Sequence, residues 1–353
     1  MTIEHYGWNA DRNKKWETWL EANQERRAGK DYVPARVTGD YGMGLKLVSD
    51  KGEVWGQVSG RLRHHTLLEG DLPAVGDWVI ISDGEDTAVI HGVLERSSRI
   101  SRQAAGNQIR EQLIAANVDT LLLVTALNHD FNPRRLERYL IMAWNSGANP
   151  IIVLSKRDLS DCVEQQLAEV ERIAPGVPVV AVSALQELGK EQLEQILVPG
   201  NTIAMTGTSG CGKSTMLNWL SGASIQQTQG VREEDSRGRH TTTARQMFVL
   251  PQGAIMIDTP GMRELTLWEE GTGLSSAFGD IEDLAQDCKF SDCRHQSETG
   301  CAVRKAMDEG VLPSERLTSY LKLQYQARKE AESLRRKQQG KSFSGKTRQG
   351  KQR

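Results

Sequence analysis

Residues 207–214 read Gly-Thr-Ser-Gly-Cys-Gly-Lys-Ser, a run that could bind the phosphates of a nucleoside triphosphate. Its glycines let the backbone curl until successive N–H groups point at phosphate oxygens. Lys213 can reach the β- and γ-phosphates, and the Ser214 hydroxyl can ligate Mg²⁺. The alternative is a tight glycine turn with an exposed lysine. The residues that we expect around the phosphates are Gly207, Thr208, Ser209, Gly210, Cys211, Gly212, Lys213, Ser214 and Thr215.

The segments on either side of this run favour the phosphate-binding interpretation. Residues 202–205 predict a buried strand before it, and residues 215–220 predict a helix after it. A helix that begins at the loop adds the partial positive charge of its N-terminus to the site. Strand, glycine-rich loop and helix together are the setting of a P-loop.

A second strand end carries groups that could complete a magnesium and γ-phosphate site. Residues 255–257 predict a strand followed by Asp-Thr-Pro-Gly, in which Asp258 can hold the Mg²⁺ shell and the Gly261 N–H can sense the γ-phosphate. Between the two strands, residues 238–243 read Gly-Arg-His-Thr-Thr-Thr. This cluster can supply a switch hydroxyl for Mg²⁺, which we expect from Thr242 or from a threonine beside it.

Two further strand ends, upstream of the P-loop, could read the base. An apolar strand at 150–154 precedes Ser-Lys-Arg-Asp, and another at 177–182 precedes Ser-Ala. A carboxylate can accept two hydrogen bonds from the N1–H and N2–H₂ edge of guanine, and adenine has no such donor pair. A Lys-x-Asp after a strand, taken alone, is usually a solvated loop. Here nucleotide-binding motifs follow four predicted strands, and together they predict guanine specificity. The residues concerned are Ser155, Lys156, Arg157, Asp158, Ser183 and Ala184.

The order of these motifs predicts a circular permutation. Ras-like GTPases run from the P-loop through both switches to the base-recognition motifs. In this chain the base-recognition motifs, at 155–158 and 183–184, come before the P-loop at 207. The permutation ties the segment after Gly261 directly to the element that senses the γ-phosphate.

This C-terminal segment contains a cluster of potential metal ligands. Cys288, Cys293, His295 and Cys301 supply three thiolates and an imidazole, the ligand set of a closed, structural zinc site. Disulfides fit poorly beside a cytosolic nucleotide site, and redox or catalytic cysteines are the remaining alternative. We interpret Cys211 as a structural P-loop residue, and we expect Cys162 to pack as a small apolar residue.

The permuted motif order, Gly-Arg-His-Thr-Thr-Thr, Asp-Thr-Pro-Gly and the Cys-x₄-Cys-x-His-x₅-Cys segment together resemble the small ribosomal subunit biogenesis GTPases. This family, called RsgA or EngC/YjeQ-type, is matched from about residue 31 to about residue 338. The resemblance implies an N-terminal OB-fold, a circularly permuted Ras-like α/β GTPase domain and a C-terminal zinc-binding helical domain. It implies a GTP hydrolase that binds GTP/GDP with Mg²⁺ and carries one Zn²⁺. It also implies that the small (30S) subunit stimulates hydrolysis and that the protein acts in the late maturation of this subunit.

Two positions depart from the Ras-like pattern. Ser155 stands where Asn usually braces the P-loop, and a shorter serine can do only part of that. Met262 follows Gly261 where Ras-like enzymes keep a glutamine that orients the attacking water. The family resemblance implies that His240 takes over this catalytic role, beside Lys213 and Thr242.

The N-terminal third agrees with an RNA-binding barrel. Residues 31–100 alternate short strand-like stretches with glycine turns and show no helix pattern, which favours a small closed barrel. The basic run 60–65 could be a loop that meets a phosphate backbone, or simply a solvated hairpin. In residues 1–30, Trp16 and Trp19 lie at helical spacing, and we expect a packed cap rather than a binding surface.

Charge is unevenly distributed along the 353 residues. Residues 1–334 hold 36 basic and 46 acidic side chains, a net charge of −10, whereas 335–353 hold eight basic and no acidic ones. Such a tail is typical of a disordered arm for RNA phosphates, or of a solubilising tail. We expect helical residues 313–334 to pack near the cysteine cluster. The apolar stretch 121–127 is far shorter than the about twenty residues of a membrane span.

We therefore expect a cytoplasmic monomer that contacts the small ribosomal subunit and its 16S rRNA and no membrane. Alternatives from other classes are a P-loop kinase or ATPase acting on a small molecule, and an RNA-binding scaffold in which nucleotide is structural. The expected domains are a helical extension (1–30), the OB-fold (31–100), the permuted GTPase (101–280), the zinc-binding helical domain (281–338) and the basic tail (339–353).

Overall fold

The computed structural model describes residues 1–24, 31–65, 71–82, 87–103, 111–222, 245–258, 277–314, 316–325 and 328–329. The chain forms two compact units. The first comprises Met1–Tyr139 and Ser146–Thr266, and the second comprises Leu140–Asn145 and Leu267–Arg353. We describe each unit by itself.

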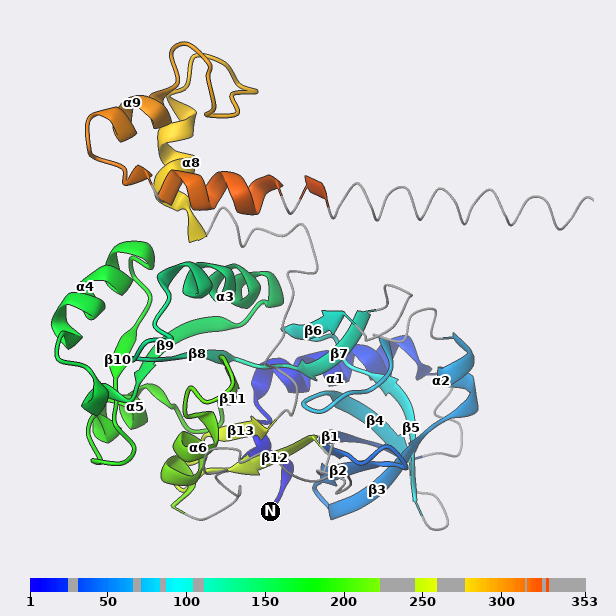
Figure 1. Ribbon diagram of the computed structural model, residues 1–353. Coiled ribbons are helices and arrows are strands. Elements are labelled where there is room, and N and C mark those ends of the chain that lie inside the picture. The colour runs from blue at the N-terminus through cyan, green and yellow to red at the C-terminus, as the bar shows by residue number, and fades with distance from the viewer. Residues whose placement is uncertain are drawn as a thin grey trace, which may run out of the picture. The chain divides into compact units, whose positions relative to one another are not determined.

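The first unit begins with a five-stranded closed barrel (Figure 1). Its strands follow one another in the order β1-β2-β3-β5-β4, and β4 closes the barrel by pairing with β1. All neighbours are antiparallel except β3 and β5, as their strand registers show. The barrel confirms the OB-fold expected from the sequence. Its strands are β1 (Tyr32–Asp40), β2 (Leu45–Ser49), β3 (Gly52–Val58), β4 (Trp78–Ser82) and β5 (Ala88–Val93).

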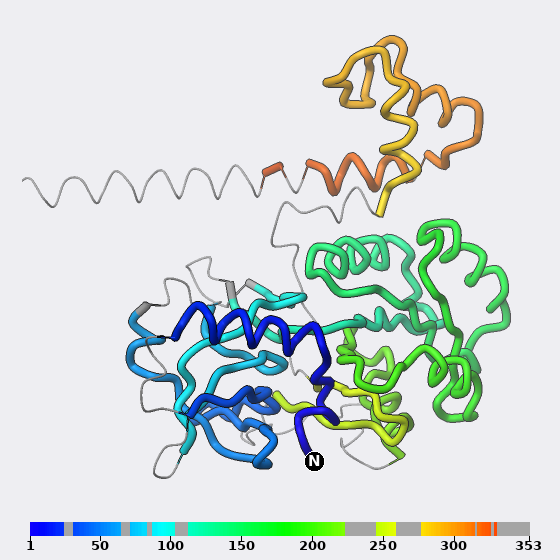
Figure 2. The backbone as a smooth tube through the Cα atoms, turned by 180° about the vertical axis from the view of Figure 1, so that it is seen from behind, coloured from blue at the N-terminus to red at the C-terminus, as the bar shows by residue number. Residues whose placement is uncertain are grey.

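The N-terminal segment packs on this barrel as a cap. A short 3-10 helix η1 (Ile3–Tyr6) precedes α1 (Ala10–Ala22), which lies against the barrel in Figure 2. The Asn9 side chain caps α1 by accepting a hydrogen bond from the Arg12 N–H. The Trp19 ring meets Tyr32 of β1 edge-on at 5.6 Å, so the tryptophans of this helix serve packing, as expected.

The rest of the first unit is an α/β layer built on a six-stranded sheet with the order β10-β9-β8-β11-β13-β12. The first five strands are parallel and β12 is antiparallel to β13. These strands are β8 (Thr120–Ala126), β9 (Asn149–Ser155), β10 (Val179–Ala181), β11 (Thr202–Thr206), β12 (Arg245–Val249) and β13 (Ile255–Asp258). The flanking helices are α3 (Pro133–Ser146), of which Leu140–Asn145 belong to the second unit, α4 (Val163–Ile173), α5 (Lys190–Ile196) and α6 (Lys213–Ser221).

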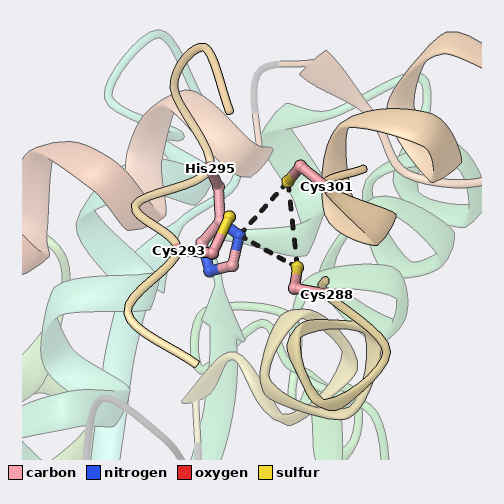
Figure 3. A group of neighbouring side chains, drawn as sticks. All are labelled: Cys288, Cys293, His295 and Cys301. Carbon is pink, nitrogen blue, oxygen red and sulfur yellow. Dashed lines mark hydrogen bonds between the residues drawn. The ribbon is translucent and has the colours of Figure 1, made fainter. Parts of the chain in front are cut away.

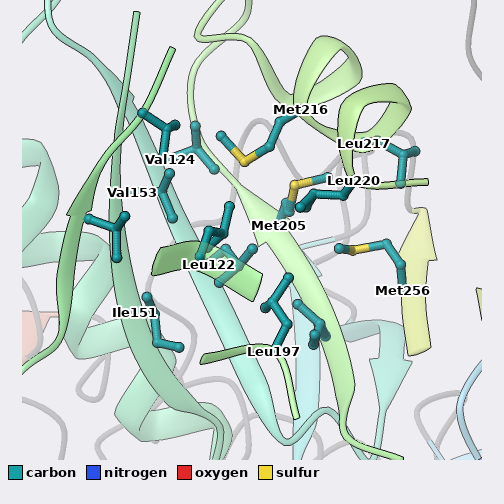
Figure 4. Close-up of a cluster of buried hydrophobic side chains, with 14 of the residues drawn as sticks. Leu122, Val124, Ile151, Val153, Leu197, Met205, Met216, Leu217, Leu220 and Met256 are labelled. Atoms are coloured by element: carbon teal, nitrogen blue, oxygen red, sulfur yellow. The ribbon is translucent and has the colours of Figure 1, made fainter. Parts of the chain in front are cut away.

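The core of this layer explains why the strands read as continuous apolar runs. A parallel sheet covered by helices buries both faces, so side chains of either parity must be apolar. Leu122, Val153, Met205, Leu217 and Met256 interdigitate in one buried cluster between sheet and helices (Figure 4). This packing fixes the carboxyl ends of the parallel strands along one edge of the sheet.

The barrel and the α/β layer share one continuous sheet. Strand β1 of the barrel pairs with β12, with Gly39 opposite Gln246 and Asp40 opposite Arg245. A separate ribbon pairs β6 (Arg99–Gln103) with β7 (Glu111–Ala116), in the stretch of chain between the barrel strands and β8. The strand order around β11 is that of a Ras-like sheet whose chain starts at β8, which confirms the expected permutation.

The second unit has its own core around two helices, α8 (Gly279–Gln286) and α9 (Ala302–Asp308), and the helical residues 316–325. Arg316 forms a two-pronged ion pair with Asp280, with 2.6 and 2.7 Å between nitrogens and oxygens. Leu317 and Tyr320 are buried in the same cluster as Cys301. The described part of the expected helix 313–334 therefore packs next to the cysteine cluster, as the sequence predicts.

Two expectations were wrong. Residues 60–65 are not a loop but the helix α2 (Gly60–His65), because the Ser59 hydroxyl accepts from the Leu62 N–H and starts a turn. Cys162 does not pack as an apolar residue; it is exposed at the position before α4.

Within the described residues, no helix is long and apolar enough to cross a membrane. The basic tail lies outside them.

Candidate functional site

The run 207–212 forms a tight loop between β11 and α6. Gly207, Gly210 and Gly212 all have positive φ angles, of 154°, 78° and 100°. A Cβ on Gly207 would lie 2.2 Å from the carbonyl oxygen of Val124, so no other residue fits there. Ser209 and Gly210 are exposed at the tip, and Ser214 and Thr215 follow in the first turn of α6. The local geometry is that of a P-loop.

The Lys213 side chain curls over this loop. Its Nζ donates hydrogen bonds of 2.7 Å to the carbonyl oxygens of both Gly207 and Thr208. The ammonium therefore lies at the centre of the loop, among the groups that would surround a phosphate. From here a small rotation of a flexible side chain would carry the charge to a bound phosphate.

Ser155 braces the P-loop from the neighbouring strand end. The side chain is 4% exposed, and its hydroxyl lies 2.5 Å from the carbonyl oxygen of Cys211 and 3.3 Å from that of Thr125. The serine, although shorter than an asparagine, thus reaches the loop. Cys211 is 1% exposed in the apolar core, in agreement with a structural role.

Behind Ser155, the turn that holds Asp158 meets the end of β10. Lys156 has a φ of 55°, and the short 3-10 helix η4 (Arg157–Leu159) follows it. The Ser183 hydroxyl donates a hydrogen bond to Asp158, and the Arg157 N–H donates to the carbonyl of Val182 at 3.0 Å. The structure therefore brings together the two predicted base-recognition segments, with Ala184 directly after Ser183.

The predicted switch residues are described only in part. Asp258 is half-buried at the end of β13. Strand β13 is the direct neighbour of β11, the strand that leads into the P-loop. Gly261, Thr242 and His240 lie outside the described residues. The described chain resumes at Arg245, where β12 begins next to β13.

Sequence reasoning missed one carboxylate at this site. Asp130 follows β8, and its Oδ2 accepts a hydrogen bond of 2.7 Å from the Thr208 hydroxyl of the P-loop. Arg135, in the first turn of α3, donates to the same oxygen at 2.9 Å. The position of Asp130 in the sequence could have revealed it. Asp130 follows β8, another parallel strand whose carboxyl end lies at the same edge of the sheet.

Cys288, Cys293, His295 and Cys301 converge in the second unit (Figure 3), and their ligand atoms lie within 4.8 Å of one another. Cys288 Sγ lies 3.6 Å from His295 Nδ1 and 3.9 Å from Cys301 Sγ, and Nδ1 lies 3.4 Å from Cys301 Sγ. A tetrahedral Zn²⁺ with ordinary bond lengths separates two sulfurs by about 3.8 Å and sulfur from nitrogen by about 3.6 Å. The residues fit a zinc ion.

The surroundings of the cluster also suit a metal. Burial lowers the pKa of His295, which favours the neutral imidazole that a metal requires. The Arg304 N–H donates to Cys301 Sγ at 3.4 Å, where this sulfur caps helix α9. With four protein ligands no coordination position remains open, so the zinc would be structural.

A family model described as RsgA GTPase matches residues 93–268, the range that contains all the nucleotide motifs. The small ribosomal subunit biogenesis GTPase RsgA of Opitutus terrae is 43% identical over 332 residues, covering 91% of this chain and 90% of that protein. RsgA 1 of Listeria innocua is 43% identical over 342 residues, covering 96% and 94%. The chain belongs to the RsgA GTPase family.

Solved structures agree with membership in the RsgA family. YjeQ from Thermotoga maritima matches with a TM-score of 0.65 and 27% identity, covering 84% of this chain and 99% of that one. YloQ, described as a circularly permuted GTPase, matches in fold with a TM-score of 0.62 and 22% identity over 85% and 96%. An ABC transporter model also matches residues 191–347. This range includes the P-loop, a motif that ABC transporters and GTPases share.

Proposed function

We propose that this chain binds GTP with Mg²⁺, hydrolyses it to GDP and phosphate, and acts in biogenesis of the small ribosomal subunit. The observation that carries the proposal is the convergence of strand ends at one edge of a parallel sheet. The end of β9 brings Ser155 and Asp158 to that edge, β10 brings Ser183, β11 brings the P-loop, and β13 brings Asp258. Ligands of open α/β sheets bind along this edge.

Asp158 and Ser183 would select the base. The Ser183 hydroxyl is used as a donor to Asp158, so the carboxylate is held in one orientation. It can then accept from the N1–H and N2–H₂ groups of guanine, while the Lys156 stem and Arg157 flank the base. The backbone of Ser183 and Ala184 would meet the guanine O6.

Hydrolysis would proceed by in-line attack of water on the γ-phosphate. The P-loop N–H groups and Lys213 hold the phosphates, and Gly261 senses the γ-phosphate. Ser214, Thr242 and Asp258 would hold Mg²⁺, which neutralises phosphate charge when bound. His240 would position the attacking water, because Met262 cannot hydrogen-bond it.

The remaining parts of the chain would contact the particle. Relatives carry the name small ribosomal subunit biogenesis GTPase. On the barrel, Trp55 is 47% exposed and Tyr41 38%, with the rings 5.3 Å apart, and exposed aromatic rings can stack on RNA bases. We infer that the barrel (31–100), the zinc-binding domain (281–338) and the basic tail (339–353) contact 16S rRNA, in a cytoplasmic monomer.

The decisive experiment measures GTP hydrolysis by the full-length protein alone, with small subunits and with large subunits. We expect slow turnover alone and strong stimulation by small subunits only. Lys213→Ala, which removes the charge over the P-loop, should hydrolyse GTP neither alone nor with small subunits. Stimulated hydrolysis by Lys213→Ala would refute the P-loop assignment. Turnover of ATP with a small molecule would indicate a kinase, and absence of multiple turnover would indicate a scaffold.

A further inference from the structure

The Asp130 carboxylate accepts hydrogen bonds from two side chains that belong to different segments. Oδ2 accepts from the Thr208 hydroxyl at 2.7 Å and from Arg135 at 2.9 Å. The loop that carries it is itself fixed, because the Asp130 N–H donates to the Asn128 side chain at 3.0 Å. Asn132 in turn accepts from the Arg135 N–H at 3.2 Å and so begins α3. The carboxylate therefore reaches the P-loop from a preorganised turn.

This carboxylate is an anion beside a phosphate site. The hydrogen bond from Thr208 lowers the pKa of Asp130, and the hydrogen bond and charge of Arg135 add to the effect against the opposing influence of burial. Asp130 therefore stays ionised at neutral pH. A charged acceptor forms a hydrogen bond about twice as strong as a neutral one. The Arg135 cation compensates a negative charge that would otherwise repel phosphate.

Several hydrogen bonds hold Thr208, and the one from Lys213 would be lost with nucleotide bound. The Thr208 carbonyl accepts from Lys213 Nζ at 2.7 Å and from the Cys211 N–H at 3.4 Å, and its hydroxyl donates to Asp130. When Lys213 turns to the β- and γ-phosphates, the first tie is lost. The Asp130 bond then still ties the first half of the P-loop to the turn after β8, as the Ser155 bond ties the second half at Cys211 to the end of β9.

We propose that Asp130, held by Arg135, is a positioning residue that keeps the P-loop in its phosphate-binding shape through the Thr208 hydroxyl. The idea rests on the proposed GTP binding. Asp130 does not touch the nucleotide itself. It acts on the orientation of the Thr208 peptide, and through it on the N–H groups that face the phosphates.

The test compares GTP dissociation constants of full-length variants by titration with a fluorescent GTP analogue. Thr208→Val keeps the shape and removes the hydroxyl, and should weaken binding about threefold to tenfold, the range expected for one hydrogen bond. Thr208→Ser keeps the hydroxyl and should recover most of the affinity. In steady-state hydrolysis, the KM of Thr208→Val should rise by more than its kcat falls.

A double-mutant cycle identifies the partner. Asp130→Asn should weaken GTP binding in the parent but add little in the Thr208→Val background, because both substitutions act on the same bond. Thr208→Val removes its donor, and Asp130→Asn replaces its charged acceptor with a weaker neutral one. Thr38→Val is the matched control, since it removes a hydroxyl that donates to the Lys46 carbonyl at 3.2 Å in the barrel. It should leave the dissociation constant as in the parent, whatever its effect on thermal stability.

The outcomes are separable from failure of the proposed function. A parent protein that does not bind GTP refutes the function itself. If the parent binds GTP, then an unchanged dissociation constant in Thr208→Val, or equal effects of Asp130→Asn in both backgrounds, overturns the positioning role. A loss of thermal stability with unchanged affinity would likewise assign Asp130 to folding alone and reject the proposal.

Discussion

The Ser155 hydroxyl donates a hydrogen bond of 2.5 Å to the carbonyl of Cys211, which joins the end of β9 to the P-loop. A buried hydroxyl therefore links the turn proposed to read the base to the P-loop. Gly212 lies close by, since a Cβ added there would be 3.8 Å from the Ser155 oxygen. We infer from these two contacts that Ser155 helps to hold the P-loop in its shape.

Ser155→Ala should raise the GTP dissociation constant about threefold to tenfold, because it removes this brace and leaves a buried carbonyl without its donor. The measurement is a nucleotide titration of the purified variant. Ser160→Ala is a suitable control, since the Ser160 hydroxyl donates to Gln166 at 2.7 Å on the same connection but away from the P-loop. Equal affinities for Ser155→Ala and the parent would contradict the role of the brace.

Asp158→Asn should exchange guanine preference for xanthine preference. The Ser183 hydroxyl donates toward this side chain, so it should hold the oxygen of the introduced amide and turn the amide nitrogen to the base. That nitrogen is a donor, which suits the 2-oxo acceptor of xanthine and not the N2–H₂ group of guanine. Dissociation constants for GTP and XTP measure the exchange, with Asp161→Asn in the same connection as control. An unaltered preference would mean that another loop reads the base.

The purified protein should contain one zinc per chain, held by Cys288, Cys293, His295 and Cys301. Elemental analysis checks this number, and Cys293→Ser should reduce it. Cys162→Ser is the matched control, because Cys162 is exposed and outside the cluster, and it should retain the metal. A full zinc content in Cys293→Ser would exclude this ligand set.

Removal of that metal should loosen the second unit before the first. Its core is small and includes Cys301 itself, so folding there should depend on metal binding. Hydrogen exchange with a chelator present measures the effect, and exchange should rise in residues 277–325 while the P-loop strand stays protected. Simultaneous loss of protection in both units would argue against a local structural zinc.

His240→Ala should remove most of the subunit-stimulated rate while GTP affinity stays within a few-fold of the parent. A residue that contacts the attacking water acts mainly in the transition state, so its loss appears in kcat. Binding to small subunits with a non-hydrolysable GTP analogue separates the roles, with His5→Ala as control. Lost particle binding, with hydrolysis restored at high subunit concentration, would assign His240 to docking.

Arg36→Met should destabilise the first unit by about 3 kcal/mol, because it removes a buried group that donates several hydrogen bonds. Arg36 is fully buried and donates to the carbonyls of Tyr6 and Gly76 and, at 2.7 Å, to the Thr202 hydroxyl at the start of the P-loop strand. Burial lowers its pKa to about 9, so it remains charged at neutral pH.

The measurement for Arg36→Met is urea unfolding followed by tryptophan fluorescence, since the guanidinium lies 4.8 Å from the Trp78 ring. Lys46→Met is the matched control, because it breaks a partly exposed ion pair with Glu53 on the same barrel. That change should cost less than about 1 kcal/mol. Equal costs for the two variants would rule out Arg36 as a tie between barrel and P-loop strand.

Much of the site could be predicted from sequence because its groups are contiguous. Gly207 to Ser214, the Asp158 segment and the four zinc ligands each carry their chemistry within a few residues, at spacings that the backbone dictates. Their order alone predicted the permuted sheet. The helix at 60–65 could also have been predicted, because Ser59 is a typical capping residue. The basic composition of this segment suggested a loop instead.

Only the tertiary structure revealed the pairs that hold these segments together. Asp130 with Thr208, Ser155 with Cys211 and Arg36 with Thr202 are joined by hydrogen bonds across 78, 56 and 166 residues of sequence. No local periodicity or spacing encodes such pairs, because each depends on which strands become neighbours in the sheet. The sequence by itself determined the chemistry available to this protein, and the packing of parallel strands decided which side chains position it.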